Sequence, residues 1–217
     1  YKAYGSDGGQ FKSPDDQMVM DEVSAIKDIK EVRFDRVDKN IEYIGEEIDE
    51  LYLKEIKKLS VSPEAIQRQH DLKIVFSPIH GTGITLVPAA LKRFGFTNVN
   101  IVEEQAIPDG NFPTVIYPNP EEKEALSLAI AKAVEIDADL VLATDPDADR
   151  VGIAVKNNEG EFILLNGNQT AMIAFNYMIE ARKAKGIAQP NDMVVKTIVT
   201  TDMIDIIAKK NNVACYN

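Results

Sequence analysis

The sequence predicts an α/β protein built around a layered domain with a mixed sheet. Between residues 71 and 188, short apolar runs rich in β-branched residues alternate with segments of helical periodicity. That alternation of strand and helix is typical of a layered α/β domain. Within it, residues 151–155 and 161–165 flank an Asn-Asn-Glu-Gly turn. Such a pair predicts a hairpin, which would add an antiparallel edge strand to the sheet.

Residues 1–70 are predicted to be mostly helical and to form the end of one structural unit. The string Ser13-Pro14-Asp15-Asp16 is typical of a helix start, and apolar residues follow it at helical spacing. A second helix is predicted over residues 48–59, and a short third one begins at Ser62.

Residues 71–188 are predicted to be the central domain. The run 72–76 is apolar and β-branched and ends at Ser77-Pro78, which is typical of a buried strand. Further strands are expected at 99–102 and 139–144, and helices at 86–94, 121–134 and 168–184. Gln189 to Asp192 is a predicted linker. A strand over 193–199 and a helix over 201–210 would then begin a third unit, residues 189–217.

Composition limits the classes of partner. The chain has 217 residues, a net charge of -11 and a pI of about 4.7, which argues against a nucleic-acid or anionic-membrane surface. A single cysteine, Cys215, permits no internal disulfide and favours a cytoplasmic location. We find no leader segment and no apolar run long enough to span a bilayer. The sequence leaves the oligomeric state open.

The most informative segment is Thr144-Asp145-Pro146-Asp147-Ala148-Asp149-Arg150. Three carboxylates stand at alternate positions directly after a predicted buried strand, and ligands of α/β sheets collect at the carboxyl ends of strands. Three anions this close repel one another unless a cation joins them. An all-oxygen set selects a hard ion such as Mg²⁺ or Ca²⁺. The arginine beside them offers a fork for phosphate oxygens.

Other interpretations of this loop must be weighed. Acidic loops at strand ends often only solvate a turn, but the proline, the arginine and the preceding strand favour a site here. A calcium hand requires Gly at the sixth position and Glu at the twelfth, where this chain has Arg150 and Lys156. A phosphatase or mutase of the haloacid-dehalogenase type, with Asp145 as nucleophile, remains an alternative. So does a non-catalytic module that binds a sugar phosphate.

The complete string Thr-Asp-Pro-Asp-Ala-Asp-Arg-Val-Gly-Ile-Ala-Val, residues 144–155, resembles the metal loop of the α-D-phosphohexomutase superfamily, which includes phosphoglucomutases and phosphomannomutases. Four other segments agree in the same order along the chain: Tyr1-Lys2-Ala3-Tyr4, residues 76–83, residues 165–169 and residues 195–202. The resemblance therefore spans the chain. It implies a three-layer α/β/α domain with a mixed sheet for residues 71–188, flanked by the end of a first domain and the start of a third.

The resemblance also implies a mechanism. A phosphoserine gives its phosphoryl group to a hexose phosphate, the bound bisphosphate reorients, and the other phosphate returns to the serine. Asp145, Asp147 and Asp149 would bind Mg²⁺, Arg150 would contact the transferring phosphate, and Lys2 would act as a general acid or base. The substrates would be glucose or mannose phosphates, and glucose 1,6-bisphosphate would be the activator of the intact enzyme.

The sequence departs from the family pattern, because the Glu-containing sugar-recognition loop of the third domain, the phosphate-binding fourth domain and the nucleophile loop are not found in it. The Ser-His-Asn-Pro nucleophile loop does not occur in the 217 residues. We therefore expect a central fragment of a longer enzyme that binds metal weakly and has no mutase activity alone. His80-Gly81-Thr82-Gly83 lacks the third glycine of a dinucleotide fingerprint, so we interpret it as a structural turn with His80 as a brace.

Overall fold

The computed structural model describes residues 3–217, which form two compact units that meet between Ile44 and Gly45. The first contains an antiparallel bridge between Tyr4 and Gln10, helix α1 (Asp15–Ala25), and two short 3-10 helices, η1 (Ile29–Glu31) and η2 (Asp38–Asn40). None of the described residues up to Ile44 is buried. The described residues of this unit therefore form no hydrophobic core of their own.

The second unit is organised around a five-stranded sheet in the order β2-β1-β3-β4-β5. Its strands are β1 (Ile74–Ser77), β2 (Val99–Ile101), β3 (Leu140–Thr144), β4 (Val151–Lys156) and β5 (Phe162–Leu165). Strand β1 pairs in parallel with β2 and β3, and the hairpin β4–β5 continues the sheet in antiparallel fashion. The predicted mixed α/β sheet, with its antiparallel edge, is confirmed.

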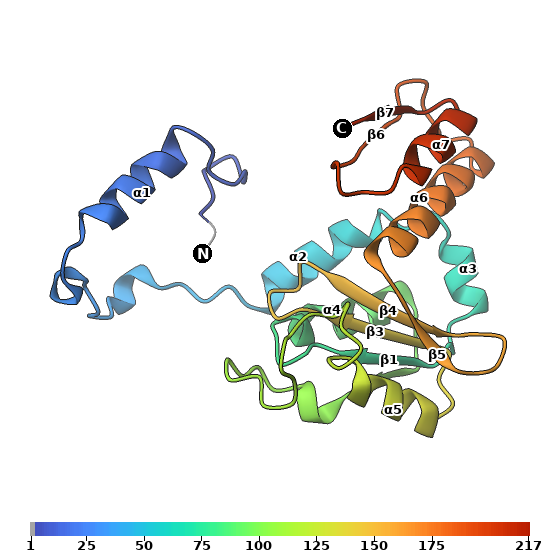
Figure 1. The fold of residues 1–217 in the computed structure, drawn as a ribbon, viewed down its shortest axis with the longest axis horizontal. Helices are drawn as coiled ribbons and strands as arrows, with labels where there is room; N and C mark the ends of the chain where they lie inside the picture. The colour runs from blue at the N-terminus through green and yellow to red at the C-terminus, as the bar shows by residue number, and fades with distance from the viewer. Residues whose placement is uncertain (1–2) are drawn as a thin grey trace. The chain divides into compact units, whose positions relative to one another are not determined.

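Helices cover both faces of this sheet (Figure 1). Helix α4 (Gly83–Phe94) connects β1 outward to the edge strand β2, and α5 (Ser127–Glu135) belongs to the return from β2 past β1 to β3. Because parallel crossovers are right-handed, connections in opposite directions place their helices on opposite faces. The remaining helices of the central region are α2 (Glu46–Lys57), which packs on α4, α3 (Pro63–Arg68) and α6 (Gly167–Ala184).

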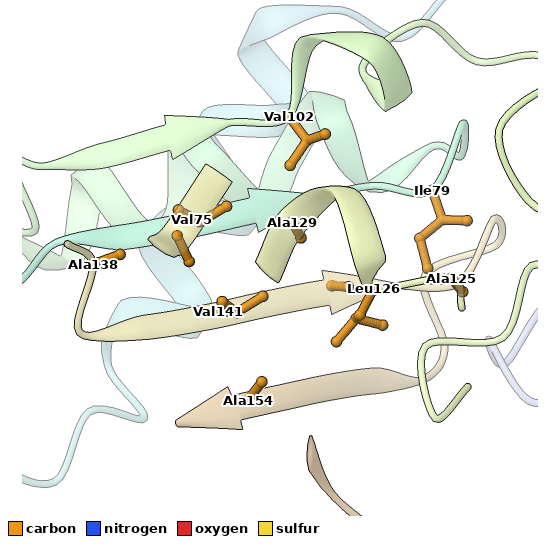
Figure 2. Packing of buried hydrophobic residues seen from close by; sticks show 11 residues of the cluster. Val75, Ile79, Val102, Ala125, Leu126, Ala129, Ala138, Val141 and Ala154 are labelled. Carbon is orange, nitrogen blue, oxygen red and sulfur yellow. The ribbon is translucent and has the colours of Figure 1, made fainter. Parts of the chain in front are cut away.

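The core lies between α5 and the middle of the sheet. Val75, Val141 and Ala154 are aligned across β1, β3 and β4, and Leu126 and Ala129 pack onto this row from the helix (Figure 2). All five are fully buried. Small residues on α5 let the helix approach the sheet closely, so this layer is dense and apolar.

The C-terminal part forms a small parallel pair, β6 (Met193–Val195) and β7 (Ala214–Tyr216), connected through α7 (Met203–Lys210). Lys196 follows β6, and its side chain is almost fully buried. Its ammonium group lies 3.3 Å from Asp202 and 2.9 Å from Asp205. This pairing with two carboxylates compensates the charge of a lysine that burial would otherwise destabilise.

Two predicted elements have clearly different bounds in the structure, and one observed strand was not predicted. Helix α5 begins at Ser127 rather than 121, because the Glu121 side chain accepts from Gly167 N and Glu124 accepts from Ile116 N instead of extending the helix. Strand β6 ends at Val195, since residues 197–200 form a turn closed by Thr200 N and Thr197 O. Strand β7 was not predicted at all.

Across the described residues, no helix is both long and apolar enough to cross a membrane.

Candidate metal centre

The acidic segment is the loop of the β3–β4 hairpin. Thr144 pairs with Val151, so residues 145–150 form the whole connection at the carboxyl end of β3. The loop is closed by a turn in which Ala148 N donates to Asp145 O at 3.0 Å. Ala148 lies in the left-handed region with φ 59. The tight turn directs the side chains that follow it back toward Asp145.

Asp145 and Arg150 form the base of this loop. Asp145 is 1% exposed, and its two carboxylate oxygens accept from Arg150, one from the backbone N at 3.0 Å and one from Nε at 2.7 Å. The hydrogen bond to Asp145 is the main cause that raises the pKa of the Arg150 guanidinium above its usual value. Arg150 therefore remains a full positive charge beside the carboxylates, with half of its side chain open to solvent.

The loop brings three carboxylates together. Asp145, Asp147 and Asp149 each offer an oxygen, and these oxygens lie within 4.8 Å of one another. Asp145 is buried and the other two are exposed, so two of the three can adjust at little cost. Opposite ligands of Mg²⁺, at about 2.1 Å from the ion, lie about 4.2 Å apart. The all-oxygen donor set suits a hard divalent cation, and because its spread of up to 4.8 Å slightly exceeds this span, its exposed carboxylates would move inward around Mg²⁺.

The turn after β1 holds the acidic loop from one side. Thr82 donates to Pro146 O from its backbone N at 2.8 Å and from Oγ1 at 3.1 Å. A Cβ on Gly81 would lie 2.3 Å from Pro146 Cα, and a Cβ on Gly83 would lie 2.4 Å from Thr144 Oγ1. Both glycines are therefore required for the turn after β1 to approach the end of β3 and the acidic loop closely. The two segments meet because β1 and β3 are neighbours in the sheet.

A second loop holds Arg150 from the other side. Arg150 Nη1 donates to Asn119 Oδ1 at 3.3 Å. The loop carrying Asn119 packs so closely on β4 that a Cβ on Gly152 would lie 2.1 Å from Pro120 O. Asn119 was not predicted as a site residue. The signal that could have found it is its position between Pro118 and Pro120, which restricts the backbone and presents the amide in a fixed direction.

His80 lies beneath these loops and is buried, as expected of a brace. One ring nitrogen lies 3.1 Å from Ile107 O and the other 2.9 Å from Thr114 Oγ1. Gln105, also buried, donates to the same hydroxyl at 3.0 Å and receives a hydrogen bond from Ser77 Oγ. This network fixes residues 105–115 against the end of β1. Its role is to hold these segments together rather than to contact a ligand.

The other predicted catalytic residue, Lys2, lies outside the described residues. Of the predicted site, the structure thus brings together Asp145, Asp147, Asp149 and Arg150. Their roles as metal ligands and as a phosphate contact stay predictions.

Fold and loop together define an α/β protein with a cluster of oxygen donors at the strand ends of a mixed sheet. Two sequence profiles identify the family within this class of protein. The one described as phosphoglucomutase/phosphomannomutase, alpha/beta/alpha domain II, matches residues 50–160, and the domain III profile of that family matches residues 166–217. The chain belongs to the phosphoglucomutase/phosphomannomutase family.

Known relatives agree with this assignment. The phosphoglucomutase of Staphylococcus aureus (strain MRSA252) is 32% identical over 216 residues, which is 98% of this chain and 38% of that protein. The chain thus spans 38% of the length of this curated relative.

Two solved structures share the fold. A phosphoglucomutase/phosphomannomutase family protein from Burkholderia thailandensis has a TM-score of 0.52 and 21% identity, over 74% of this chain and 32% of that one. A phosphomannomutase candidate from Thermus thermophilus has a TM-score of 0.56 and 20% identity, over 78% of this chain and 35% of that one.

Proposed function

We propose that this chain is the cation-binding part of a mutase that interconverts hexose 1-phosphates and hexose 6-phosphates of glucose, mannose or both. The observation that carries the proposal is the convergence of Asp145, Asp147 and Asp149 within 4.8 Å beside the guanidinium of Arg150. When bound there, Mg²⁺ would neutralise charge on a transferring phosphoryl group. Membership of the family supports phosphoryl transfer on a sugar phosphate as the reaction class. The three carboxylates and Arg150 are the groups that would hold the cation and contact the phosphate.

The roles of the chain's own residues follow from their positions. The three carboxylates hold the cation, with Asp145 fixed by burial and the other two able to adjust at the surface. Arg150 presents a positive, partly exposed guanidinium for phosphate oxygens. We further propose that Lys2 moves a proton at the sugar hydroxyl. Glucose 1,6-bisphosphate would activate the intact enzyme by phosphorylating its serine.

The nucleophilic serine of this proposal lies outside the 217 residues, because none of them forms a Ser-His-Asn-Pro string. The same proposal places residues 1–70, 71–188 and 189–217 in the end of one domain, a metal-binding domain and the start of another. It also places the protein in the cytoplasm. The chain alone is then inactive. Conversion of glucose 1-phosphate is expected of a polypeptide that also carries the serine loop.

The geometry favours Asp145 as a cation ligand over Asp145 as a nucleophile. Its carboxylate is buried, and both oxygens accept hydrogen bonds from Arg150. Attack on a phosphorus atom requires room for a phosphoryl group in line with the attacking oxygen, whereas a bare cation needs only one of the lone pairs that each carboxylate oxygen keeps beside its hydrogen bond. Trapping a beryllofluoride adduct on Asp145 would reverse this preference.

Cation binding provides the direct test. We expect Mn²⁺, used as a paramagnetic probe for Mg²⁺, to bind the 217-residue chain with one site, and Asp147→Asn to weaken binding by about tenfold or more because one of three carboxylates is lost. Titration followed by electron paramagnetic resonance measures both affinities. The matched control is Asp71→Asn, an exposed aspartate outside the cluster, which should bind as the unmodified chain does. Equal affinity in all three proteins would contradict the proposal.

A further inference from the structure

The guanidinium of Arg150 has two anchors of different charge. Nε donates to the carboxylate of Asp145 at 2.7 Å, and Nη1 donates to the amide oxygen of Asn119 at 3.3 Å. The first contact alone fixes one edge of the guanidinium and leaves the plane free to turn about that hydrogen bond. The second contact, from a segment 31 residues away in the sequence, fixes the plane.

Asn119 is itself held in place. Its Oδ1 also accepts from Glu121 N at 3.1 Å, and its backbone N donates to Tyr117 O at 2.8 Å. Glu121 in turn accepts from Gly167 N at 3.0 Å, which ties the loop to the start of α6. The amide oxygen that meets Arg150 is therefore a fixed point, connected to β4 and to α6, rather than the tip of a mobile side chain.

The chemistry of the second anchor matters as much as its position. An arginine fork binds a phosphate well only if its planar donors are oriented before the ligand arrives. A carboxylate at position 119 would orient the fork but would also neutralise it, whereas an amide orients it and leaves the charge for the ligand. A neutral acceptor on this side is what a phosphate-binding arginine requires when it is already paired with Asp145 and lies 3.9 Å from a carboxylate oxygen of Asp149.

We propose that Asn119 is a positioning residue that orients the Arg150 guanidinium for phosphate. The inference rests on the proposed function, since it assumes that Arg150 contacts a phosphate. Asn119 itself touches no reacting atom and acts through Arg150.

Three variants of the 217-residue chain test this role. Asn119→Ala removes the anchor, and Asn119→Asp keeps an acceptor in place but adds a negative charge. Asn111→Ala is the control. Asn111 is an exposed asparagine earlier in the same segment, and its hydrogen bonds are to Asp109 rather than to Arg150. For each protein, nitrogen NMR measures rotation of the Arg150 guanidinium, and titrations measure the affinities for Mn²⁺ and, with Mg²⁺ present, for inorganic phosphate.

We expect Asn119→Ala to speed guanidinium rotation and to weaken phosphate binding about tenfold, while Mn²⁺ affinity stays within about twofold. Asn119→Asp should keep rotation slow and still weaken phosphate binding, which a purely structural role of the loop would not produce. Asn111→Ala should match the unmodified chain in all three measurements.

The inference is overturned if Asn119→Ala leaves rotation and phosphate binding unchanged. It is also overturned if the variant loses Mn²⁺ and phosphate affinity in parallel with its melting temperature, because that pattern belongs to a collapsed loop. Absence of Mn²⁺ binding in the unmodified chain would instead count against the proposed function. The rotation measurement needs no ion and decides the role of Asn119 separately.

Discussion

At the scale of single residues, the site depends on positions where a side chain is missing. Gly81 and Gly83 let the turn after β1 lie directly on the acidic loop, and Gly152 lets the Asn119 loop lie on β4. In each case the closest neighbour of an added Cβ would be less than 2.5 Å away, well inside van der Waals contact. The functional side chains are thus aligned by backbone segments that touch one another.

Replacing Gly81 tests this requirement. A Cβ there would lie 2.3 Å from Pro146 Cα and 2.6 Å from Pro146 O, and a backbone neighbour has little freedom to move away. We expect Gly81→Ala to lower the free energy of unfolding by about 1–3 kcal/mol, as overpacking does, and to weaken Mn²⁺ binding by displacing Pro146. Chemical denaturation followed by circular dichroism measures the first effect.

The control for this experiment is Gly110→Ala. A Cβ on Gly110 would meet nothing within 4 Å, so the change should stay within about 0.5 kcal/mol of the unmodified chain. If both alanine variants are equally stable, the turn after β1 does not pack closely on the acidic loop.

At the scale of elements, a cluster of buried hydrophobic residues joins α5 and the segment before it to the middle of the sheet (Figure 2). Leu126 is fully buried against the row of Val75, Val141 and Ala154. Since β3 ends at the acidic loop, packing at this point also sets the position of the strand that leads into Asp145.

Truncating Leu126 should therefore be costly. We expect Leu126→Ala to destabilise the chain by about 2–5 kcal/mol, through lost burial and the cavity left behind. Val134→Ala on the same stretch is the control, because Val134 is 64% exposed. A loss for Leu126→Ala no larger than the loss for Val134→Ala, measured by denaturation in urea, would show that this layer is not the core.

The pair β6–β7 and helix α7 should respond to acid. The hydrogen bond from Lys196 is the main cause that holds the pKa of Asp205 below its usual value of 3.8. A carboxyl group whose pKa is lower in the folded chain than in the unfolded chain stabilises the fold above the unfolded value, and loses that contribution as pH falls through the folded value. Hydrogen exchange in α7, corrected for the slower intrinsic exchange of amides in acid, should therefore accelerate as the pH falls from about 4.

Asp205→Asn should weaken this acid dependence, because the amide cannot be protonated in that range. An equally steep acceleration in the variant would assign the effect to another group.

At the scale of the whole molecule, the sequence predicted the parts that depend on local pattern. Buried strands such as 139–144 were visible because apolar residues run without interruption from Leu140 to Ala143, and the hairpin was visible from its turn. The predicted start of α5 at residue 121 was wrong because Glu121 accepts a hydrogen bond from Gly167 N, 46 residues away, a contact that local pattern does not reveal. Asn119 was missed for the same reason, since its partner lies 31 residues away.

The division between Ile44 and Gly45 gives a prediction for the chain as a whole. None of the described residues before it is buried, so they add little to the stability of the sheet. We expect residues 45–217 alone to unfold at a temperature within a few degrees of the complete chain, about 2–4 °C for a change of 1 kcal/mol at this size. Differential scanning calorimetry measures this temperature. Failure of residues 45–217 to fold would mean that the first unit stabilises the second.

The hydrogen bonds from Thr82 to Pro146 O join segments 64 residues apart in sequence. The hairpin loop itself closes over six residues, 145–150, and can form locally. Its hydrogen bonds with Thr82, however, can form only after β1 and β3 have paired. Contacts of such long range are made slowly, after the entropy of a large loop has been lost. We therefore expect the acidic loop to reach its final shape only after β1 and β3 have paired, so that the spacing of its carboxylates depends on contacts made across the whole sheet.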